Sequence, residues 1–181
     1  ILVDDTEANA LISLCEYEVY IYKVTSTGDV LVWSGEQRRR TGKLDESHDD
    51  WCTIYCYDWF YALKDRYTAK TVTYSSIDAG LIAWQMINTS QLKTNGNFGI
   101  TQGTITATQD RDRVYENQNI MEAISNLSDV IGGFDFEITN DKVFNVYTVK
   151  GTDLTDSLIL EYGRNLQTVS IDEDFTEPCN N

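Results

Sequence analysis

The chain has 181 residues, 41% of them hydrophobic, which is enough to bury one substantial core or two small ones. Its 14 Lys and Arg stand against 29 Asp and Glu, a formal net charge of -15 at pH 7, which argues against nucleic-acid binding through neutralised phosphates. No apolar run is long enough for a signal peptide or a membrane span. Because the chain begins at Ile1 and not at Met, we interpret it as part of a longer protein.

The first third of the chain is predicted to be β-structure. Apolar residues alternate or form short runs over 11–33, the sequence Ser-Thr-Gly-Asp at 26–29 supplies a hairpin turn, and Gly35 is expected to end the hairpin. The polar residues 38–50 are expected to form an exposed loop. Further strands are expected at Trp51–Tyr57 and 69–74. Three to five antiparallel strands are enough for part of a small barrel or curled sheet.

The pattern changes at Ser75, after which a helix is expected. Ser76 or Asp78 can cap this helix, whose apolar residues recur at intervals of about three and four until it ends near Gln91. These apolar positions are Ile77, Leu81, Ile82, Trp84 and Ile87. The polar residues 93–109 are expected to form a loop with a short strand.

A second helix and a hairpin follow. The helix is expected to start near Asn117 or Asn119 and to end at Gly132 and Gly133, one of them in the left-handed cap conformation. Its predicted apolar stripe comprises Ile120, Met121, Ile124, Leu127, Val130 and Ile131. Alternating residues on both sides of the turn at 139–142 predict the hairpin. The last strand candidates are 157–161 and 166–171.

The sequence therefore predicts an α+β protein in three parts. Residues 1–74 are expected to form an antiparallel, β-barrel-like part. Residues 75–156 are expected to form a small α+β domain with two helices and a β-hairpin, and residues 157–181 strands that lead back to the first part.

No sequence motif indicates a catalytic site, because GxSxG, HExxH, CxxC and phosphate-loop patterns are all missing. Asp58 beside Trp59, Phe60 and Tyr61 is where a glycosidase carboxylate would be sought, but a chain with 29 acids yields such a neighbourhood by chance. His48 lies among acids and is expected to be exposed. We predict no catalytic residue.

No metal or cofactor site is predicted either. The four cysteines match no zinc spacing, and they are Cys15, Cys52, Cys56 and Cys179. Cys52 and Cys56 would lie ~13 Å apart along one strand, too far to bridge, so free thiols are expected. The acids at 110–113 and 172–174 lack the spacing and the glycine of an EF-hand and are interpreted as solvated loops. The basic triplet Arg38, Arg39 and Arg40 is expected to pair with acids of a neighbouring subunit.

Three segments carry a family resemblance. A helix at 119–131 leads through a glycine turn to Gly-Phe-Asp-Phe-Glu-Ile, the segment Lys-Val-Phe-Asn-Val-Tyr follows at 142–147, and 158–166 contains Tyr-Gly-Arg-Asn. These segments resemble minor tail and tail-tip hub proteins of long-tailed bacteriophages, with Ala-Trp-Gln-Met-Ile at 83–87 and Trp-Ser-Gly at 33–35 in the same order. The resemblance covers most of 11–175.

The resemblance implies a structural virion protein and not an enzyme. A hub of small β-barrels, with 75–156 as an α+β insertion, would close the tail tube, link it to other proteins and let DNA pass on infection. The implied partners are copies of the chain in a trimeric or higher ring, the distal tail or tube, the tape measure, and fibre or receptor-binding proteins. No sequence-specific nucleic-acid contact is implied, assembly would occur in the host cytoplasm, and the net negative charge suits a channel that conducts DNA. Any lytic domain would lie beyond Asn181.

Two other functional classes stay open. The four Trp and eleven Tyr also suit a carbohydrate-binding or adhesion module, which predicts an exposed aromatic platform, whereas the hub predicts aromatic side chains buried in cores or interfaces. A hydrolase predicts a carboxylate pair in a cleft, one of them with a raised pKa, with Asp58 as the first candidate.

Overall fold

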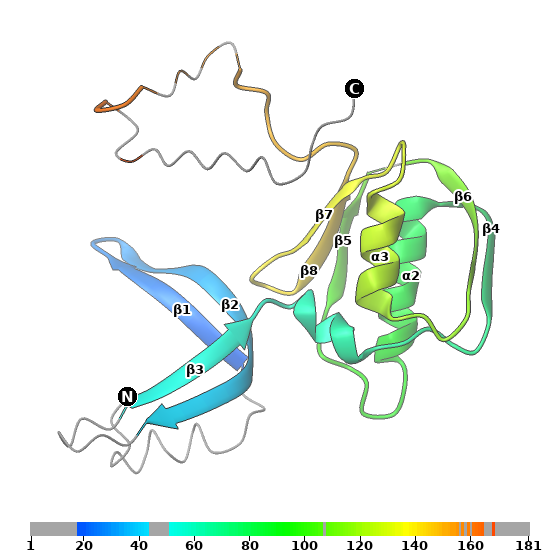
Figure 1. Cartoon of the computed structure of the whole chain (residues 1–181), viewed down its shortest axis with the longest axis horizontal. Coiled ribbons are helices and arrows are strands. Elements are labelled where there is room, and N and C mark those ends of the chain that lie inside the picture. Colours follow the sequence, from blue (N-terminus) through cyan, green and yellow to red (C-terminus); the bar gives the residue numbers. More distant parts are fainter. Residues whose placement is uncertain are drawn as a thin grey trace, which may run out of the picture. The chain divides into compact units, whose positions relative to one another are not determined.

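The computed structural model in Figure 1 describes residues 18–43, 51–106, 108–155, 157, 159, 161–164 and 168. The chain divides into two compact units, Ile1–Lys150 and Gly151–Asn181. All the named helices and strands fall in the first unit, and they confirm the α+β class. Among the described residues, no helix is long and apolar enough to cross a membrane.

The first three strands form one antiparallel sheet in the order β1-β2-β3. The strands are β1 (Glu18–Thr25), β2 (Gly28–Lys43) and β3 (Trp51–Tyr57). β1 pairs with the first half of β2, and β3 pairs with its second half, so only the row of Glu18, Glu36 and Tyr57 crosses all three strands. The predicted hairpin with its turn before Gly28 and the strand at Trp51–Tyr57 are confirmed.

Two predictions for this region are wrong. β2 continues through Gly35, where the ring of Trp33 and the carbonyl of Tyr57 leave no space for a Cβ, so this glycine permits a close approach and does not end the strand. Residues 38–43 belong to β2 and not to a loop, because β3 provides a hydrogen-bonding ladder whatever the polarity of the side chains. No sheet of the described residues closes into a barrel.

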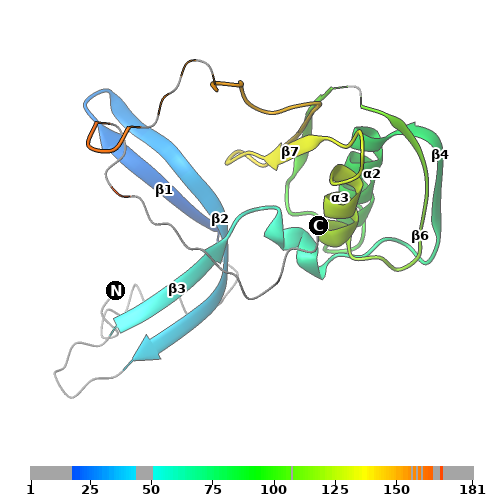
Figure 2. The same cartoon turned by 45° about the horizontal axis from the view of Figure 1, so that its top comes forward.

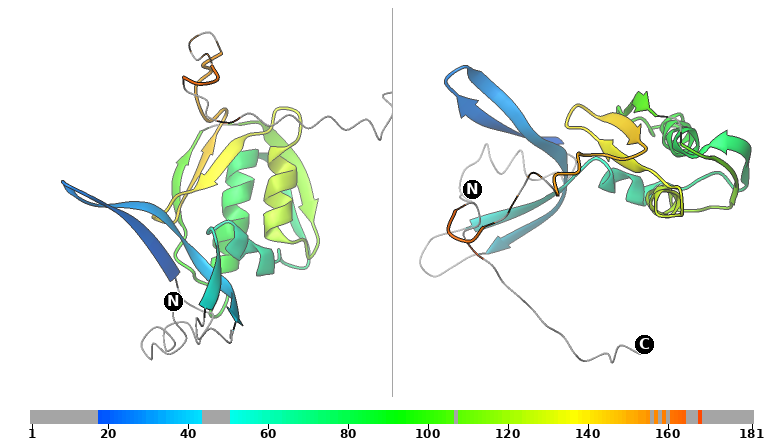
Figure 3. Two further views of the ribbon diagram at one scale, coloured as in Figure 1. Left: turned by 60° about the vertical axis from the view of Figure 1, so that its left-hand side comes forward. Right: turned by 90° about the horizontal axis from the view of Figure 1, so that it is seen from above.

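The rest of the first unit is a layered α/β core. A short 3-10 helix, η1 (Tyr61–Asp65), leads into it from β3. Helices α2 (Ala79–Gln91) and α3 (Ile120–Ser128) lie side by side between two sheets (Figures 1 and 2). One sheet pairs β4 (Val72–Asp78) with β6 (Asp110–Tyr115); the other has the order β5-β8-β7, with β5 (Thr101–Ile105), β8 (Val143–Tyr147) and β7 (Asp135–Ile138). Figure 3 shows this core from two further directions.

Each helix begins at one of the two caps that the sequence offers for it, Asp78 for α2 and Asn119 for α3. The Asp78 carboxylate accepts hydrogen bonds from the backbone N–H groups of Gly80 and Leu81, at 2.9 and 3.2 Å, and α2 ends at Gln91 as expected. The Asn119 side chain accepts from the N–H of Glu122 at 3.2 Å, which starts α3. Gly132, with φ 68°, has the predicted left-handed conformation, but it does not cap α3, whose C-cap is Asp129.

Several boundaries differ from the prediction. Ile77 belongs to β4 and not to the helix. α3 ends at Ser128, so Ile131 lies beyond it and is 98% exposed. The residues Asp110–Arg113, interpreted as a loop, are strand β6, since β4 pairs with them.

The β7–β8 hairpin is confirmed, with Asp135 opposite Tyr147 and Ile138 opposite Phe144. The sequence did not predict that β5 would pair in parallel with β8, from Thr101 opposite Val143. Most of residues 157–181 lie outside the described residues, so the strands expected there stay a prediction.

One hydrophobic cluster forms the core. Its largest fully buried side chains come from η1, both helices and β8, and they are Leu63, Ile82, Ile87, Ile120, Ile124, Leu127, Phe144 and Val146. No described residue of β1, β2 or β3 belongs to this cluster. The α/β core therefore supplies most of the apolar burial on which folding depends.

Leu127→Ala tests the role of this core. Leu127 is 1% exposed, so its truncation should leave a cavity and lower the free energy of unfolding by about 2–5 kcal/mol in urea titrations. Leu92→Ala is the control, since Leu92 is 78% exposed and its loss should change stability by less than about 0.5 kcal/mol. Equal effects of the two substitutions would contradict this description of the core.

Candidate functional site

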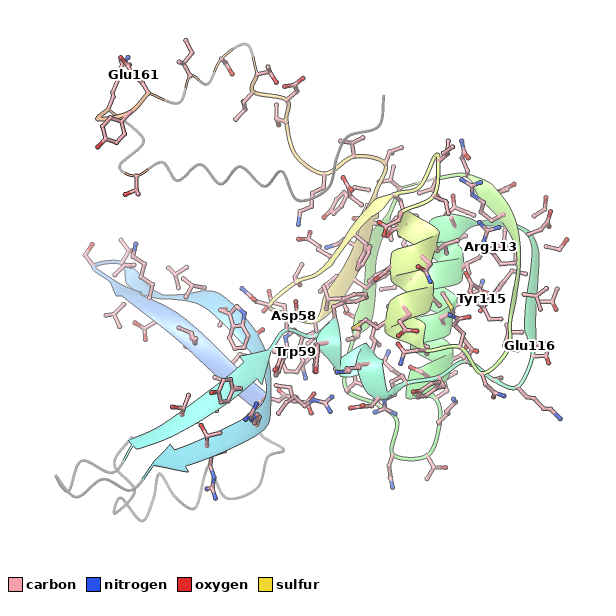
Figure 4. The ribbon with its side chains drawn as sticks, viewed as in Figure 1. Asp58, Trp59, Arg113, Tyr115, Glu116 and Glu161 are labelled. Carbon is pink, nitrogen blue, oxygen red and sulfur yellow. The ribbon has the colours of Figure 1, made fainter. Side chains whose placement is uncertain are left out.

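Asp58, the first candidate for catalysis, has a structural contact at the end of β3. Its carboxylate accepts a hydrogen bond from the backbone N–H of Tyr61 at 2.9 Å, which fixes the turn into η1. The neighbouring rings are packed: Trp59 is 3% exposed, Phe60 lies 4.8 Å from the ring of Phe136, and Tyr61 stacks on Tyr57 at 4.0 Å. Figure 4 shows Asp58 and Trp59 at this turn.

Most of the residues weighed as metal ligands in the sequence lie outside the described residues. His48, Cys15, Cys179 and 172–174 lie outside them, and the side chain of Cys52 is not described. Within the described part of the chain, no group of three His, Cys, Asp or Glu side chains is placed to hold a metal ion. Cys56 has a free, half-buried thiol, and burial raises its pKa.

Two residues of the basic triplet, Arg38 and Arg39, have partners within the chain. Arg38 forms ion pairs within the same chain, with Glu36 at 3.0 Å and with Asp65 at 2.5 Å, and its pairing with acids of a neighbouring subunit stays a prediction. The guanidinium of Arg39 lies 5.1 Å from the ring centroid of Tyr55. Local acids and an aromatic ring therefore satisfy these two charges.

A cluster of polar contacts, which we call the Trp59 junction, connects the sheet with the α/β core. The indole N–H of Trp59 donates to the hydroxyl of Ser34 at 2.7 Å, and that hydroxyl donates to the carbonyl of Asn140 at 2.6 Å. The backbone N–H of Ser34 donates to Oδ1 of Asn140 at 3.1 Å. The Lys142 ammonium lies 4.2 Å from the Trp59 ring centroid and pairs with Glu18. These five residues define the junction.

The junction shifts the protonation of two groups on β1. Two hydrogen bonds lower the pKa of Glu18, the larger effect coming from Lys142 and the smaller from Tyr20. The bond from Tyr20, in which its hydroxyl donates to Glu18 at 2.5 Å, also raises the pKa of Tyr20 to about 12. Glu18 is therefore an anion at neutral pH, and Tyr20 keeps its proton.

A cleft of about 300 Å³ lies beside the junction. Its charged wall is formed by Glu18, Glu36, Asp65, Arg38 and Arg66. Arg38 already pairs with two of these acids, and Arg66 lies over the ring of Phe98 at 4.9 Å. The charges of the cleft therefore largely satisfy one another.

The β1–β3 sheet carries a second candidate site, which we call the tyrosine face: Tyr20, Tyr22, Tyr55 and Tyr57. Residues at alternate positions of a strand share a face, and Glu36 pairs with both Glu18 and Tyr57, which places all four tyrosines on one face. They are 43%, 53%, 40% and 36% exposed in the same order.

The opposite face of this sheet also exposes apolar side chains. Ile21 and Val30 are 50% and 51% exposed, and the register puts both on the same side as Trp33. Sequence alternation indicated strands here but could not show which aromatic side chains the rest of the chain would leave uncovered.

Glu18→Gln tests the electrostatics of the junction. Because the folded-state pKa of Glu18 is lowered, its stabilising contribution is present above the ordinary glutamate pKa and is lost as pH falls through the folded value. Its side chain is 46% exposed, so we expect a loss of at most about 1 kcal/mol at pH 7. The difference from the unaltered chain should shrink in urea titrations as the pH falls below the ordinary glutamate pKa.

The control for this prediction is Glu116→Gln, which alters an exposed acid outside the junction (Figure 4). It should leave the free energy of unfolding at pH 7 unchanged. A Glu18→Gln variant as stable at pH 7 as this control would contradict the proposed contribution of Glu18.

Comparisons with known proteins do not identify a family for this chain. No protein-family model matches the sequence, and no curated protein matches it. The resemblance to phage tail-hub proteins therefore stays a prediction from the sequence segments that carry it.

Proposed function

We propose that the chain is a structural part of a phage tail-tip hub, assembled in the host cytoplasm and carried in the virion. It would help to close the tail tube, link the tube to receptor-binding or fibre proteins and let DNA pass when receptor binding rearranges the hub. The tyrosine face is the observation that carries the proposal, because it is suited to contact other subunits.

The exposed sheet has the character of an assembly surface. Three strands need an apolar face packed against something to be stable, and no described residue of this sheet joins the hydrophobic core. Tyrosine is enriched in protein interfaces because its ring buries a large apolar area while its hydroxyl keeps a polar partner. In a hub, strands of a neighbouring subunit would cover this face and complete a barrel.

Charge supports the same proposal. A chain with a net charge of -15 repels its own copies, so a ring of subunits requires apolar contacts that outweigh this repulsion at short range. The exposed rings and aliphatic side chains of the sheet supply such contacts. The remaining acids would keep DNA from binding to a lumen.

An adhesion module is the second candidate, since four exposed tyrosines on one sheet face also suit stacking against sugars. The tryptophans favour it less. Trp59 is buried, and Trp84 is half-buried and stacks near Phe144, with ring centroids 6.3 Å apart.

The deciding experiment is the oligomeric state of the chain and of any longer protein that contains it, measured by light scattering and negative-stain imaging. The hub proposal expects a trimeric or hexameric ring with a central opening. A compact monomer that binds glycans on an array would overturn the hub proposal and establish the adhesion module.

Tyr22→Ser tests whether the tyrosine face carries the association. The substitution removes an exposed ring without opening a cavity, so the monomer should stay folded while the association constant falls about tenfold or more in sedimentation experiments. Tyr67→Ser is the matched control, because Tyr67 is also 53% exposed but lies outside the sheet. If both variants associated as the unaltered chain does, the tyrosine face would not be the interface.

A further inference from the structure

The link between the β1–β3 sheet and the α/β core has two unusual properties. From Glu18 onward, the described chain passes from the sheet to the core at only one point, the turn at Asp58 between β3 and η1. The two parts also share no cluster of buried apolar side chains among the described residues. Among the described residues, the Trp59 junction and the Arg38–Asp65 ion pair are the polar contacts that hold the sheet against the core, and the ring of Tyr57 in β3 stacks on that of Tyr61 in η1.

We propose that the Trp59 junction is a releasable latch, and that the β1–β3 sheet pivots at Asp58 when the junction opens while the α/β core stays folded. A hinge needs only a few residues that absorb a change of backbone angles, and Asp58 lies in such a short connection. The inference rests on these contacts alone and holds whether or not the chain belongs to a tail hub.

The geometry makes Ser34 the centre of the latch. Its hydroxyl accepts from Trp59 and donates to Asn140, and its N–H donates to the side chain of Asn140. Ser34 is 2% exposed, so both of its partners lose a buried hydrogen bond together when the junction opens. Opening is therefore expected to be a single cooperative step and not a gradual fraying.

The Lys142 ammonium adds a second set of contacts to the junction, and these are sensitive to salt. It covers the face of the Trp59 ring, pairs with Glu18 and donates to the carbonyl of Phe98 at 3.1 Å. Ions in solution screen the pair with Glu18, whose side chain is partly exposed, but hardly affect the buried hydrogen bonds of Ser34. Raised salt should therefore favour release without melting the core.

Hydrogen exchange measured by NMR tests the latch directly, because two of its protons are reporters. The indole N–H of Trp59 and the backbone N–H of Ser34 should exchange at similar rates, at least tenfold faster than the amides of Ile82 and Ile87 in α2, and faster still at high salt. Ser34→Ala removes the partner of the Trp59 indole N–H, and Asn140→Ala removes the partner of the backbone N–H at position 34. Each substitution should also speed exchange at the other reporter tenfold or more and leave the α2 amides unchanged.

Ser26→Ala, in the exposed turn between β1 and β2, is the matched control and should exchange as the unaltered chain does. Two outcomes would overturn the latch. One is a Trp59 indole that exchanges only as slowly as the α2 amides, which would mean that the junction opens only when the whole unit unfolds. The other is a Ser34→Ala variant in which the α2 amides lose as much protection as the Trp59 indole N–H, which would make the junction part of the core.

Discussion

Most of the buried apolar side chains in the described part of the chain belong to one cluster, and the other features depend on this concentration. The core cluster runs from Leu63 to Val146 and takes its side chains from both faces of the helix layer. Burial on two sides lets short helices persist that would be marginal in isolation. The first three strands gain nothing from this burial, so their stability depends on their own ladders and on polar contacts at Trp59.

Local signals predicted much of the α/β core because the decisive residues lie close together in sequence. Asp78 and Asn119 cap helices through N–H groups two or three residues away, and the alternation around 139–142 fixes a hairpin in the same way. Errors arose where a distant partner decides the structure. β3 makes the arginine-rich residues of β2 a strand, and β8 recruits β5 in parallel.

The candidate sites were less predictable than the fold. The sequence drew attention to Asp58 and its aromatic neighbours, but nothing local shows that Trp59 would bond to Ser34, 25 residues away, or that Asn140 would close the same network. The tyrosine face could not be predicted for the same reason, since the exposure of a side chain depends on what packs against it in the folded chain. Trp and Tyr counts alone could not separate buried rings from exposed ones.

The length of β2 exceeds that of either partner, and this creates half-occupied edges. β1 covers one edge along the first half of β2 and β3 covers the opposite edge along the second half, so each half has an edge that no described strand occupies. Uncovered edges template unwanted pairing between molecules. The arginine triplet at 38–40 lies along the second half, where charge discourages a foreign strand from adding in register. The first half has no comparable run of cations, and this asymmetry makes the hairpin end of the sheet the more permissive site for a strand from outside.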